Sequence, residues 1–252
     1  MEAWNTAPEH AALPDDAVHL WIASLDWHEP IRQTFWNWLS IEERERARRF
    51  RFPELQDHFI AAHGILRDIL SRYLRISQAS LTFASDDYGK PRLKAGREAG
   101  LQFNLSHAHH MAVYAVARPR IVGVDIEEIH RIPELPLIAK NYFTDQERLL
   151  IEAEAPERRD QAFLTCWTRK EAYIKAVGRG LSIPLQSFDT SIPPSQIGCL
   201  LPADAHSPIR TNWWLTDLPR IPGHVGALAV EGGAAAEYGY WRWMPPLTAP
   251  LP

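Results

Sequence analysis

Residues 167–180 read WTRKEAYIKAVGRG, and the rest of the chain can be interpreted around this stretch. Its apolar residues recur at helical spacing, and Gly178 and Gly180 end the pattern, so it predicts a helix. Glu171 and Lys175 are four positions apart, which makes them neighbours on one side of that helix. Such a pair is usually solvated and contributes about 0.3–0.5 kcal/mol. The helix therefore indicates a site only if a second element supports it.

That second element is residues 121–129, IVGVDIEEI, whose beginning reads as a buried strand. Asp125 and Glu127 are two positions apart, so they point to the same face of a strand. Two carboxylates on one face repel each other unless water solvates them or a cation lies between them. If Glu171 joins them, the three form an oxygen-only ligand set, which suits Mg²⁺ better than zinc.

Phosphate chemistry is the natural use of such a cation. Mg²⁺ held by few carboxylates keeps bound waters and takes phosphate oxygens as further ligands. Lys170 and Lys175 flank Glu171 and could neutralise a phosphate or protonate a phosphate leaving group. These residues together favour phosphoryl-type transfer from a diphosphate donor. The sequence contains no P-loop glycine pattern, which excludes a Walker-type NTPase.

The order of elements in the first half of the chain returns in the second half. Each half has a strand, a capping box, a long helix and a further strand. The matching pairs are strands 18–25 and 121–127, capping boxes 40–43 and 144–147, helices 55–74 and 162–177, and strands 110–116 and 224–230. We therefore predict an α+β fold of two α+β halves related by a pseudo-twofold duplication. Each half has a long helix packed on an antiparallel sheet, and the site lies in the cleft between the halves.

This duplication divides the chain into three predicted parts. Residues 1–118 form the N-terminal half, residues 119–240 form the C-terminal half, and residues 241–252 form an irregular tail. Pro119 lies at the predicted boundary. Within the N-terminal half, residues 106–110 are expected to be a loop between two paired strands.

Composition limits the class of protein. The chain has 252 residues, of which 46% are hydrophobic and 23% charged, as in ordinary globular proteins. Its net charge of −4 argues against broad nucleic-acid or membrane binding. Cys166 and Cys199 are too few for a disulfide framework or a four-ligand zinc site. No signal peptide and no apolar run of membrane-spanning length are present. We therefore expect a cytoplasmic protein with neither nucleic acid nor membrane as a partner.

Residues 123–127 (GVDIE) and 167–175 (WTRKEAYIK) resemble, in sequence and order, the two signature motifs of the 4′-phosphopantetheinyl transferases. The long duplicated chain is similar to the monomeric Sfp-type branch rather than to the short trimeric holo-carrier-protein synthases. Residues 88–91 (YGKP) and 103–107 (FNLSH) resemble the coenzyme A-binding segments of that branch. The resemblance extends over most of the chain.

The resemblance implies a reaction and roles for the motif residues. The 4′-phosphopantetheine group of coenzyme A would move to a serine of an apo acyl or peptidyl carrier protein, releasing adenosine 3′,5′-bisphosphate. Asp125, Glu127 and Glu171 would be the Mg²⁺ ligands. Either Glu127 or Glu171 could accept the serine proton, and the sequence does not choose between them. Lys175 would stabilise or protonate the leaving phosphate, with Lys170 assisting.

The same resemblance implies contacts with coenzyme A. Lys90, beside Pro91, would lie near the adenine or ribose, Ser106 near the diphosphate, and His107 near the 3′-phosphate. His63 stands where many relatives carry an arginine that binds this phosphate. It offers one titratable charge in place of a permanent bidentate group, so coenzyme A affinity could depend on pH.

Two further groups of residues lie outside the motifs. Arg44, with Arg48 and Arg51, could supply the positive charge that the arginine supplies in relatives. Hydrophobic residues around Phe143 and Leu149 could receive the carrier protein.

Two alternatives to this function are another Mg²⁺-dependent phosphotransferase with a nucleotide diphosphate donor and a non-catalytic module that binds coenzyme A or a carrier protein. Because every motif position is filled, the sequence favours the enzyme over the module. A monomer is expected, since two fused halves can build within one chain the cleft that single-half relatives build between subunits.

Overall fold

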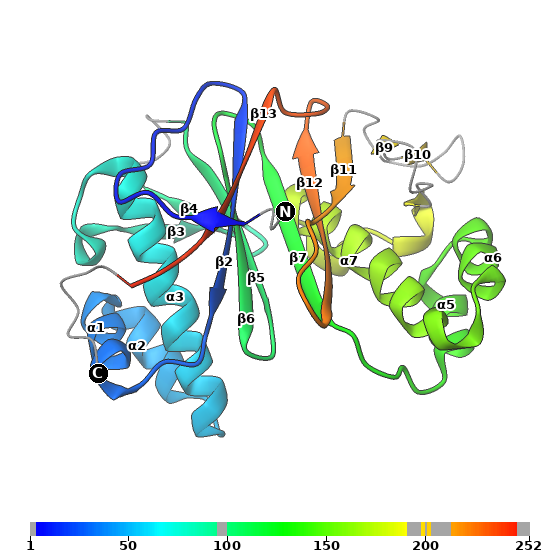
Figure 1. Cartoon of the computed structure of the whole chain (residues 1–252), viewed down its shortest axis with the longest axis horizontal. Coiled ribbons are helices and arrows are strands. Elements are labelled where there is room, and N and C mark those ends of the chain that lie inside the picture. Colours follow the sequence, from blue (N-terminus) through cyan, green and yellow to red (C-terminus); the bar gives the residue numbers. More distant parts are fainter. Residues whose placement is uncertain (1–3, 95–99, 191–197, 200, 203–212, 246–252) are drawn as a thin grey trace.

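Two sheets lie side by side in the centre of the molecule, with helices on the outer face of each (Figure 1). The structure is a computed structural model that describes residues 4–94, 100–190, 198–199, 201–202 and 213–245. The first helical layer consists of α1 (Glu29–Trp38), α2 (Ile41–Arg48) and α3 (Pro53–Leu74). The second consists of α5 (Leu135–Tyr142), α6 (Asp145–Ala153) and α7 (Arg159–Val177). Short 3₁₀ turns connect these elements at Gln78–Ser80, Pro156–Arg158, Gly180–Ser182 and Leu185–Ser187.

The first sheet packs against α3. Its strands, in spatial order, are β1 (Asn5–Thr6), β13 (Glu237–Arg242), β2 (Ala17–Ser24), β6 (Met111–Ala117) and β5 (Gln102–Ala108). Residues of β2 alternate between two cores, as the period of a strand requires. Trp21 lies in the core beneath α3, whereas Leu20 and Ile22 lie in the core between the two sheets.

The second sheet packs against α7. Its strands, in spatial order, are β7 (Val122–Glu128), β12 (His224–Glu231), β11 (Trp213–Asp217) and β9 (Gly198–Cys199). All of its pairings are antiparallel. Two short antiparallel pairs lie outside the sheets, β3 (Phe83–Ser85) with β4 (Pro91–Leu93) and β8 (Phe188–Asp189) with β10 (Leu201–Pro202).

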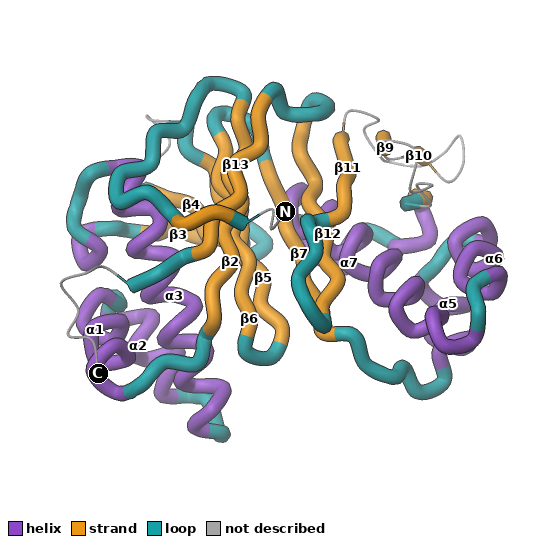
Figure 2. The backbone as a smooth tube through the Cα atoms, in the orientation of Figure 1, coloured by secondary structure: helices purple, strands orange, loops and turns teal. Residues whose placement is uncertain are grey.

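The strand order confirms the predicted duplication (Figure 2). In the first half, β2 precedes α3, and the hairpin of β5 and β6 follows, with β6 paired to β2. In the second half, β7 precedes α7, and the hairpin of β11 and β12 follows, with β12 paired to β7. Each half therefore has the same connection of strand, helix and hairpin.

Both predicted capping boxes are formed. The backbone N–H of Glu43 donates to Ser40 Oγ at 3.2 Å, and the N–H of Ser40 donates to the Glu43 carboxylate at 2.8 Å. Thr144 and Glu147 make the same reciprocal pair at 3.2 and 2.9 Å. Each box satisfies two backbone donors that the first turn of its helix would leave free, which fixes where α2 and α6 begin.

The predicted end of the C-terminal half is wrong. Residues 241 and 242 continue β13, which pairs in parallel with β2 and so belongs to the sheet of the N-terminal half. Trp243 follows, is 1% exposed, and packs against Trp27 and Phe35. Burial of this indole is worth about 2–3 kcal/mol, which explains why the segment is ordered and not an irregular tail. The rest of the predicted tail, residues 246–252, lies outside the described residues.

The predicted loop 106–110 is also shorter than expected. Ser106 and His107 lie within β5, and the turn to β6 is made by His109 and His110. His109 adopts a positive φ of 50°, which lets the hairpin reverse in two residues.

No helix of the described residues is both long and apolar enough to cross a bilayer.

Candidate active site

Strands β5 and β7 meet at the contact between the two halves. The side-chain oxygen of Asn104 on β5 accepts a hydrogen bond from the backbone N–H of Val124 on β7 at 2.8 Å. Because both residues are buried, this bond satisfies a backbone donor that the edge of β7 would otherwise leave without a partner. It also fixes the position of β5 beside the carboxylates of β7.

Gly123 lets α7 approach β7 closely. A Cβ added at this position would lie 2.7 Å from the Cα of Ala176, and nearer still to the carbonyl oxygen of Ala172. The two backbones therefore pack in direct contact, which leaves no room for any side chain at residue 123. As a result, Glu171 and Lys175 on α7 lie over the face of β7 that carries Asp125.

Asp125, Ser106 and Lys175 form the centre of the site. The Lys175 ammonium donates to Asp125 Oδ1 at 2.6 Å and to Ser106 Oγ at 2.8 Å. The Ser106 hydroxyl donates to the same carboxylate oxygen at 2.8 Å. Asp125 is 3% exposed, and its second oxygen, Oδ2, is buried without a hydrogen-bond partner among the described residues. A buried carboxylate oxygen without a partner is costly, so a hydrogen-bond donor or a cation at this atom would stabilise the site.

The three motif carboxylates influence one another. Burial raises the pKa of Asp125, although the ion pair with Lys175 opposes the rise. Burial, and then the charge of Asp125, raises the pKa of Glu127. For Glu171, burial followed by the charges of Asp125 and Glu127 raises the pKa to about 7. The sequence prediction that these carboxylates converge is therefore supported by their mutual repulsion.

The oxygen atoms of Asp125, Glu127 and Glu171 are suitable ligands for a hard cation, but these side chains do not form a complete coordination site. No group of three or more His, Cys, Asp or Glu side chains in the described stretches is arranged to hold a metal. Oδ1 of Asp125 accepts a hydrogen bond from Lys175, whereas Oδ2 has no hydrogen-bond partner among the described residues. Mg²⁺ typically takes only one or two carboxylates, with waters and phosphates as the other ligands. An open, oxygen-only site of this kind fits that mode of binding.

His107 interacts electrostatically with Lys175 and with two other histidines. The ring of His107 keeps an exposed edge, yet surrounding protein lowers its pKa, and Lys175, His63 and His58 lower it further. His63 is held by a contact of 3.2 Å between its Nδ1 and the Glu43 carboxylate. His107 is thus close enough to Lys175, His63 and His58 for their charges to act on its ring, and its contact with coenzyme A stays a prediction. His58, which the sequence did not single out, lies one and a half turns before His63 on α3.

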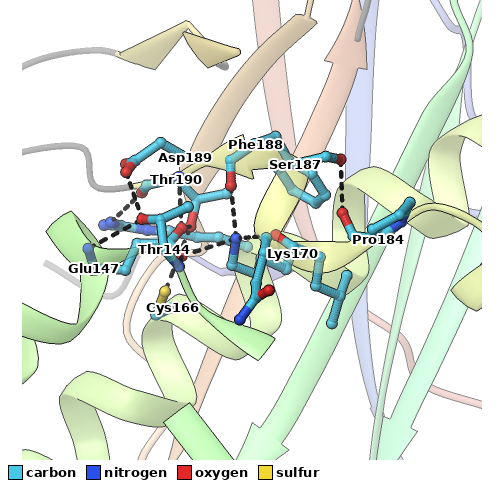
Figure 3. A network of polar contacts seen from close by, with 12 residues as sticks. Thr144, Glu147, Cys166, Lys170, Pro184, Ser187, Phe188, Asp189 and Thr190 are labelled. Carbon is cyan, nitrogen blue, oxygen red and sulfur yellow. Dashed lines mark hydrogen bonds and ion pairs between the residues drawn. The ribbon is translucent and has the colours of Figure 1, made fainter. Parts of the chain in front are cut away.

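Lys170 does not belong to this cluster, and its predicted role at the phosphate is wrong. Its side chain has no exposed surface, and its ammonium donates to the carbonyls of Leu185 and Phe188 at 2.7 and 2.8 Å (Figure 3). It also pairs with Glu147 at 2.8 Å. These contacts use all three ammonium protons, so none is left for a substrate.

Arg44 is also placed elsewhere. Its guanidinium donates to the backbone carbonyls of Trp36 and Asn37, each at 3.0 Å, at the C-terminal end of α1. It lies over the Trp36 ring, as does the guanidinium of Arg48. Arg44 therefore caps α1, where a cation is favoured, and does not compensate for His63.

Lys90, in the N-terminal half, donates hydrogen bonds to the C-terminal half. Its ammonium donates to the carbonyls of Val122 at 3.2 Å and Ala176 at 2.8 Å, the first on β7 and the second near the end of α7. Burial lowers its pKa to about 8. Lys90 and Pro91 line a cavity of about 420 Å³ with Phe103. The structure thus gives the Lys90 ammonium two protein partners, whereas the resemblance implies coenzyme A.

We expect Lys90→Met to lower the free energy of unfolding by about 1–3 kcal/mol, because two buried carbonyls would lose their donor. Urea denaturation measures this loss. Lys94→Met is the control, since Lys94 is exposed on the same hairpin and should change stability little. Unchanged stability of Lys90→Met, together with weaker coenzyme A binding, would instead support the ligand contact.

The expected carrier-docking residues separate into two classes. Phe143 is 1% exposed and packs against Phe163 and Trp167, so it cannot contact a partner. Leu149 is 60% exposed on α6 and remains available. The capping box at Thr144 begins α6 directly after Phe143. A hydrophobic residue just before an N-cap often packs inward against its helix, and the ring of Phe143 does so here.

Family models account for both halves of the chain. One described as the 4′-phosphopantetheinyl transferase superfamily matches residues 121–228, and one described as the N-terminal part of 4′-phosphopantetheinyl transferase matches residues 26–119. The 4′-phosphopantetheinyl transferase HetI of Nostoc sp. is 36% identical over 233 residues, covering 92% of this chain and 95% of its own. This chain belongs to the 4′-phosphopantetheinyl transferase family.

Other relatives place this phosphopantetheinyl transferase within the family. The 4′-phosphopantetheinyl transferase Sfp of Bacillus subtilis is 32% identical over 187 residues, covering 73% of this chain and 80% of its own. The predicted Sfp type is therefore confirmed, and so is a transferase of this class. A solved holo-(acyl-carrier-protein) synthase of Bacillus anthracis, in complex with CoA (3′,5′-ADP), is similar with a TM-score of 0.37 and 21% identity. That similarity covers 45% of this chain and 96% of the synthase.

Proposed function

We propose that this phosphopantetheinyl transferase moves the 4′-phosphopantetheine group of coenzyme A to a serine hydroxyl of an apo acyl or peptidyl carrier protein. Adenosine 3′,5′-bisphosphate is the leaving product. The observation that carries the proposal is the buried Asp125, with one oxygen held by Ser106 and Lys175 and the other without a partner. Neither alternative, a different phosphotransferase or a module without activity, has a comparable observation in its favour.

Asp125, Glu127 and Glu171 are proposed to hold Mg²⁺. When bound, this ion supplies positive charge that offsets the charge developing on the diphosphate of coenzyme A. The unpartnered Oδ2 of Asp125 supports this assignment, as do the raised pKa values of all three carboxyl groups. Burial disfavours the charged form of each carboxylate, and neighbouring carboxylates add to this for Glu127 and Glu171, so a nearby cation would favour all three charged forms.

Other side chains of the site are proposed to bind the phosphates of coenzyme A and to transfer protons. Lys175 lies where it can neutralise or protonate the phosphate that leaves, since its ammonium is already held at the centre of the site. His107 lies near Lys175, and its ring and that of His63 would donate hydrogen bonds to the phosphates of coenzyme A. One of Glu127 and Glu171 accepts the proton of the attacking serine, directly or through water. The pKa of Glu171, about 7, suits a proton acceptor near neutral pH.

The oligomeric state, cellular location and partners are proposed as the sequence predicts them. We propose a monomer that acts in the cytoplasm, with coenzyme A and a carrier protein as its partners. Support for the monomer comes from the core between the sheets, which holds Val18 and Val113 of one half against Val124 and Leu228 of the other. Both halves of the site are thus present within one chain.

The test is to incubate the enzyme with coenzyme A, Mg²⁺ and a panel of apo carrier proteins, and to weigh the intact carriers by mass spectrometry. We expect one or more carriers to gain the mass of phosphopantetheine. Glu171→Gln and a chelator are the controls, and both should prevent the gain. A folded enzyme that binds coenzyme A but modifies no carrier would contradict the proposed transfer.

The pKa of Glu171 predicts how pH and Mg²⁺ act on stability. Folding raises this pKa from 4.5 to about 7, so the folded chain binds the proton more tightly than the unfolded chain. Without metal, this group therefore lowers stability as pH rises from about 4.5 to about 7. A cation bound to the carboxylate reverses that loss.

We therefore expect added Mg²⁺ to raise the melting temperature more at pH 8 than at pH 6. Differential scanning fluorimetry measures the shift without any substrate. Glu171→Gln cannot titrate at this position, so the dependence of the shift on pH should become smaller in this variant. An equal Mg²⁺ shift at both pH values would exclude Glu171 as a ligand that must lose a proton.

A further inference from the structure

Lys170 is the centre of a buried network that the transfer chemistry does not use (Figure 3). Its ammonium donates to the carbonyl oxygens of Leu185 and Phe188 at 2.7 and 2.8 Å, and it pairs with Glu147 at 2.8 Å. Neither charged side chain has any solvent-exposed surface. An ammonium has three N–H donors, so the group is fully satisfied by protein.

Glu147 is satisfied as completely as Lys170. One carboxylate oxygen accepts the backbone N–H and the hydroxyl of Thr190, each at 2.7 Å. The other accepts the N–H of Thr144 at 2.9 Å, which is half of the capping box of α6. The network thus joins α6, α7 and the segment 185–190. A fully hydrogen-bonded buried ion pair is strongly destabilised when only one partner is removed.

The two lysines of α7 point in different directions. They are five residues apart, which places them about 140° from each other around the helix axis. Lys175 faces Asp125 and Ser106, whereas Lys170 is fastened to the segment 185–190 and to Glu147. The contacts of Lys170 therefore lie on a different side of α7 from the contacts of Lys175.

We propose that Lys170 is a positioning residue for the transfer. Its three contacts set the rotation of α7 about its axis and so hold Glu171 and Lys175 over the carboxylates of β7. Lys170 touches neither the substrate nor the reacting groups. The inference rests on the proposed function, because Glu171 and Lys175 have their roles in that reaction.

Three variants test this role. Lys170→Met leaves the Glu147 carboxylate charged, buried and without its cation, so its melting temperature should fall by roughly 10 °C. Lys170→Met combined with Glu147→Gln removes both charges and should recover most of that fall. Lys175→Met is the matched control, because it makes the same chemical change on the same helix at a partly exposed lysine that faces the site.

Each variant is compared with the wild type in melting temperature, in the rate constant kcat of carrier modification, and in affinity for coenzyme A with Mg²⁺ measured by calorimetry. The double variant should keep kcat within about tenfold of the wild type, because the reacting groups remain. Its coenzyme A affinity should fall by about three- to tenfold, because Glu171 and Lys175 are held less firmly. Lys175→Met should lose roughly 100-fold in kcat, and its melting temperature should also fall, because the buried Asp125 carboxylate loses its cation.

Two outcomes for the folded double variant would overturn the inference. A loss of kcat as large as that of Lys175→Met would make Lys170 a catalytic residue. Unchanged kcat and unchanged coenzyme A affinity would make the network purely structural. A wild type that binds coenzyme A but modifies no carrier would overturn the proposed transfer alone, because the affinity comparison needs no turnover.

A fourth variant keeps the inference testable if the double variant does not fold. Thr190→Val removes one hydroxyl donor from Glu147 and changes no charge. It should weaken coenzyme A binding by about twofold while kcat stays near that of the wild type. Unchanged affinity in a variant with a lowered melting temperature would overturn the positioning role.

Discussion

Gly123→Ala is expected to reduce the transfer rate by roughly 100-fold and to lower the free energy of unfolding by about 1–3 kcal/mol or more. The new Cβ would overlap the backbone of α7 at Ala172 and Ala176, and a backbone cannot rotate aside as a side chain can. The helix must therefore move away from β7. A displacement of about 1 Å in the catalytic groups is enough to cost 10²-fold in rate.

Urea denaturation and the carrier-modification assay together check this expectation. The control is Gly239→Ala on β13, where the three atoms nearest to the new Cβ would belong to the side chains of His19 and Trp241. That variant should lose some stability but keep the transfer rate, because β13 lies outside the site. Wild-type activity of Gly123→Ala would show that α7 need not touch β7 for the site to work.

Asp125→Asn should have opposite effects on activity and on stability. The substitution removes a carboxylate that burial already disfavours, as the raised pKa of Asp125 indicates. The stability at neutral pH should therefore be unchanged or higher, since Lys175 is partly exposed and can turn to water. The transfer rate should fall by roughly 10³-fold, because a ligand of the proposed cation is lost.

Asp145→Asn is the matched control for this change in charge. Asp145 is exposed in the first turn of α6, and its pairing with Arg148 spans only one turn of the helix. Its replacement should alter neither the melting temperature nor the rate by a measurable amount. If Asp125→Asn lost stability and activity in parallel, Asp125 would act as a structural anchor rather than as a ligand.

Local signals in the sequence predicted the elements well. The capping boxes at Ser40 and Thr144 and the long apolar periodicity of 55–74 act over one to a few helical turns, so neighbouring residues alone specify them. The alternation that puts Asp125 and Glu127 on one face of a strand is local for the same reason. Repetition of these signals was sufficient to predict the duplicated α+β fold.

Contacts between distant segments were not predictable in this way. The two lysines of the second motif are chemically identical, and only the segment that packs on each side of α7 decides that Lys170 is buried and Lys175 is not. The two carbonyl partners of Lys90 lie on elements far away in the sequence, so no local signal could predict these contacts. Gly123 did carry a usable signal, since a glycine between two valines of a buried strand indicates close backbone approach.

The pairing of β13 with β2 has a consequence for how the protein is made. While the ribosome synthesises the chain, the first half has nearly all of its elements long before β13 appears. Until then β2 is an open edge carrying His19 and Trp21, which β13 covers in the finished molecule. An uncovered edge of this kind invites pairing with other chains. The nascent enzyme is therefore most vulnerable to aggregation late in translation, and chains released early should depend on chaperones or be degraded.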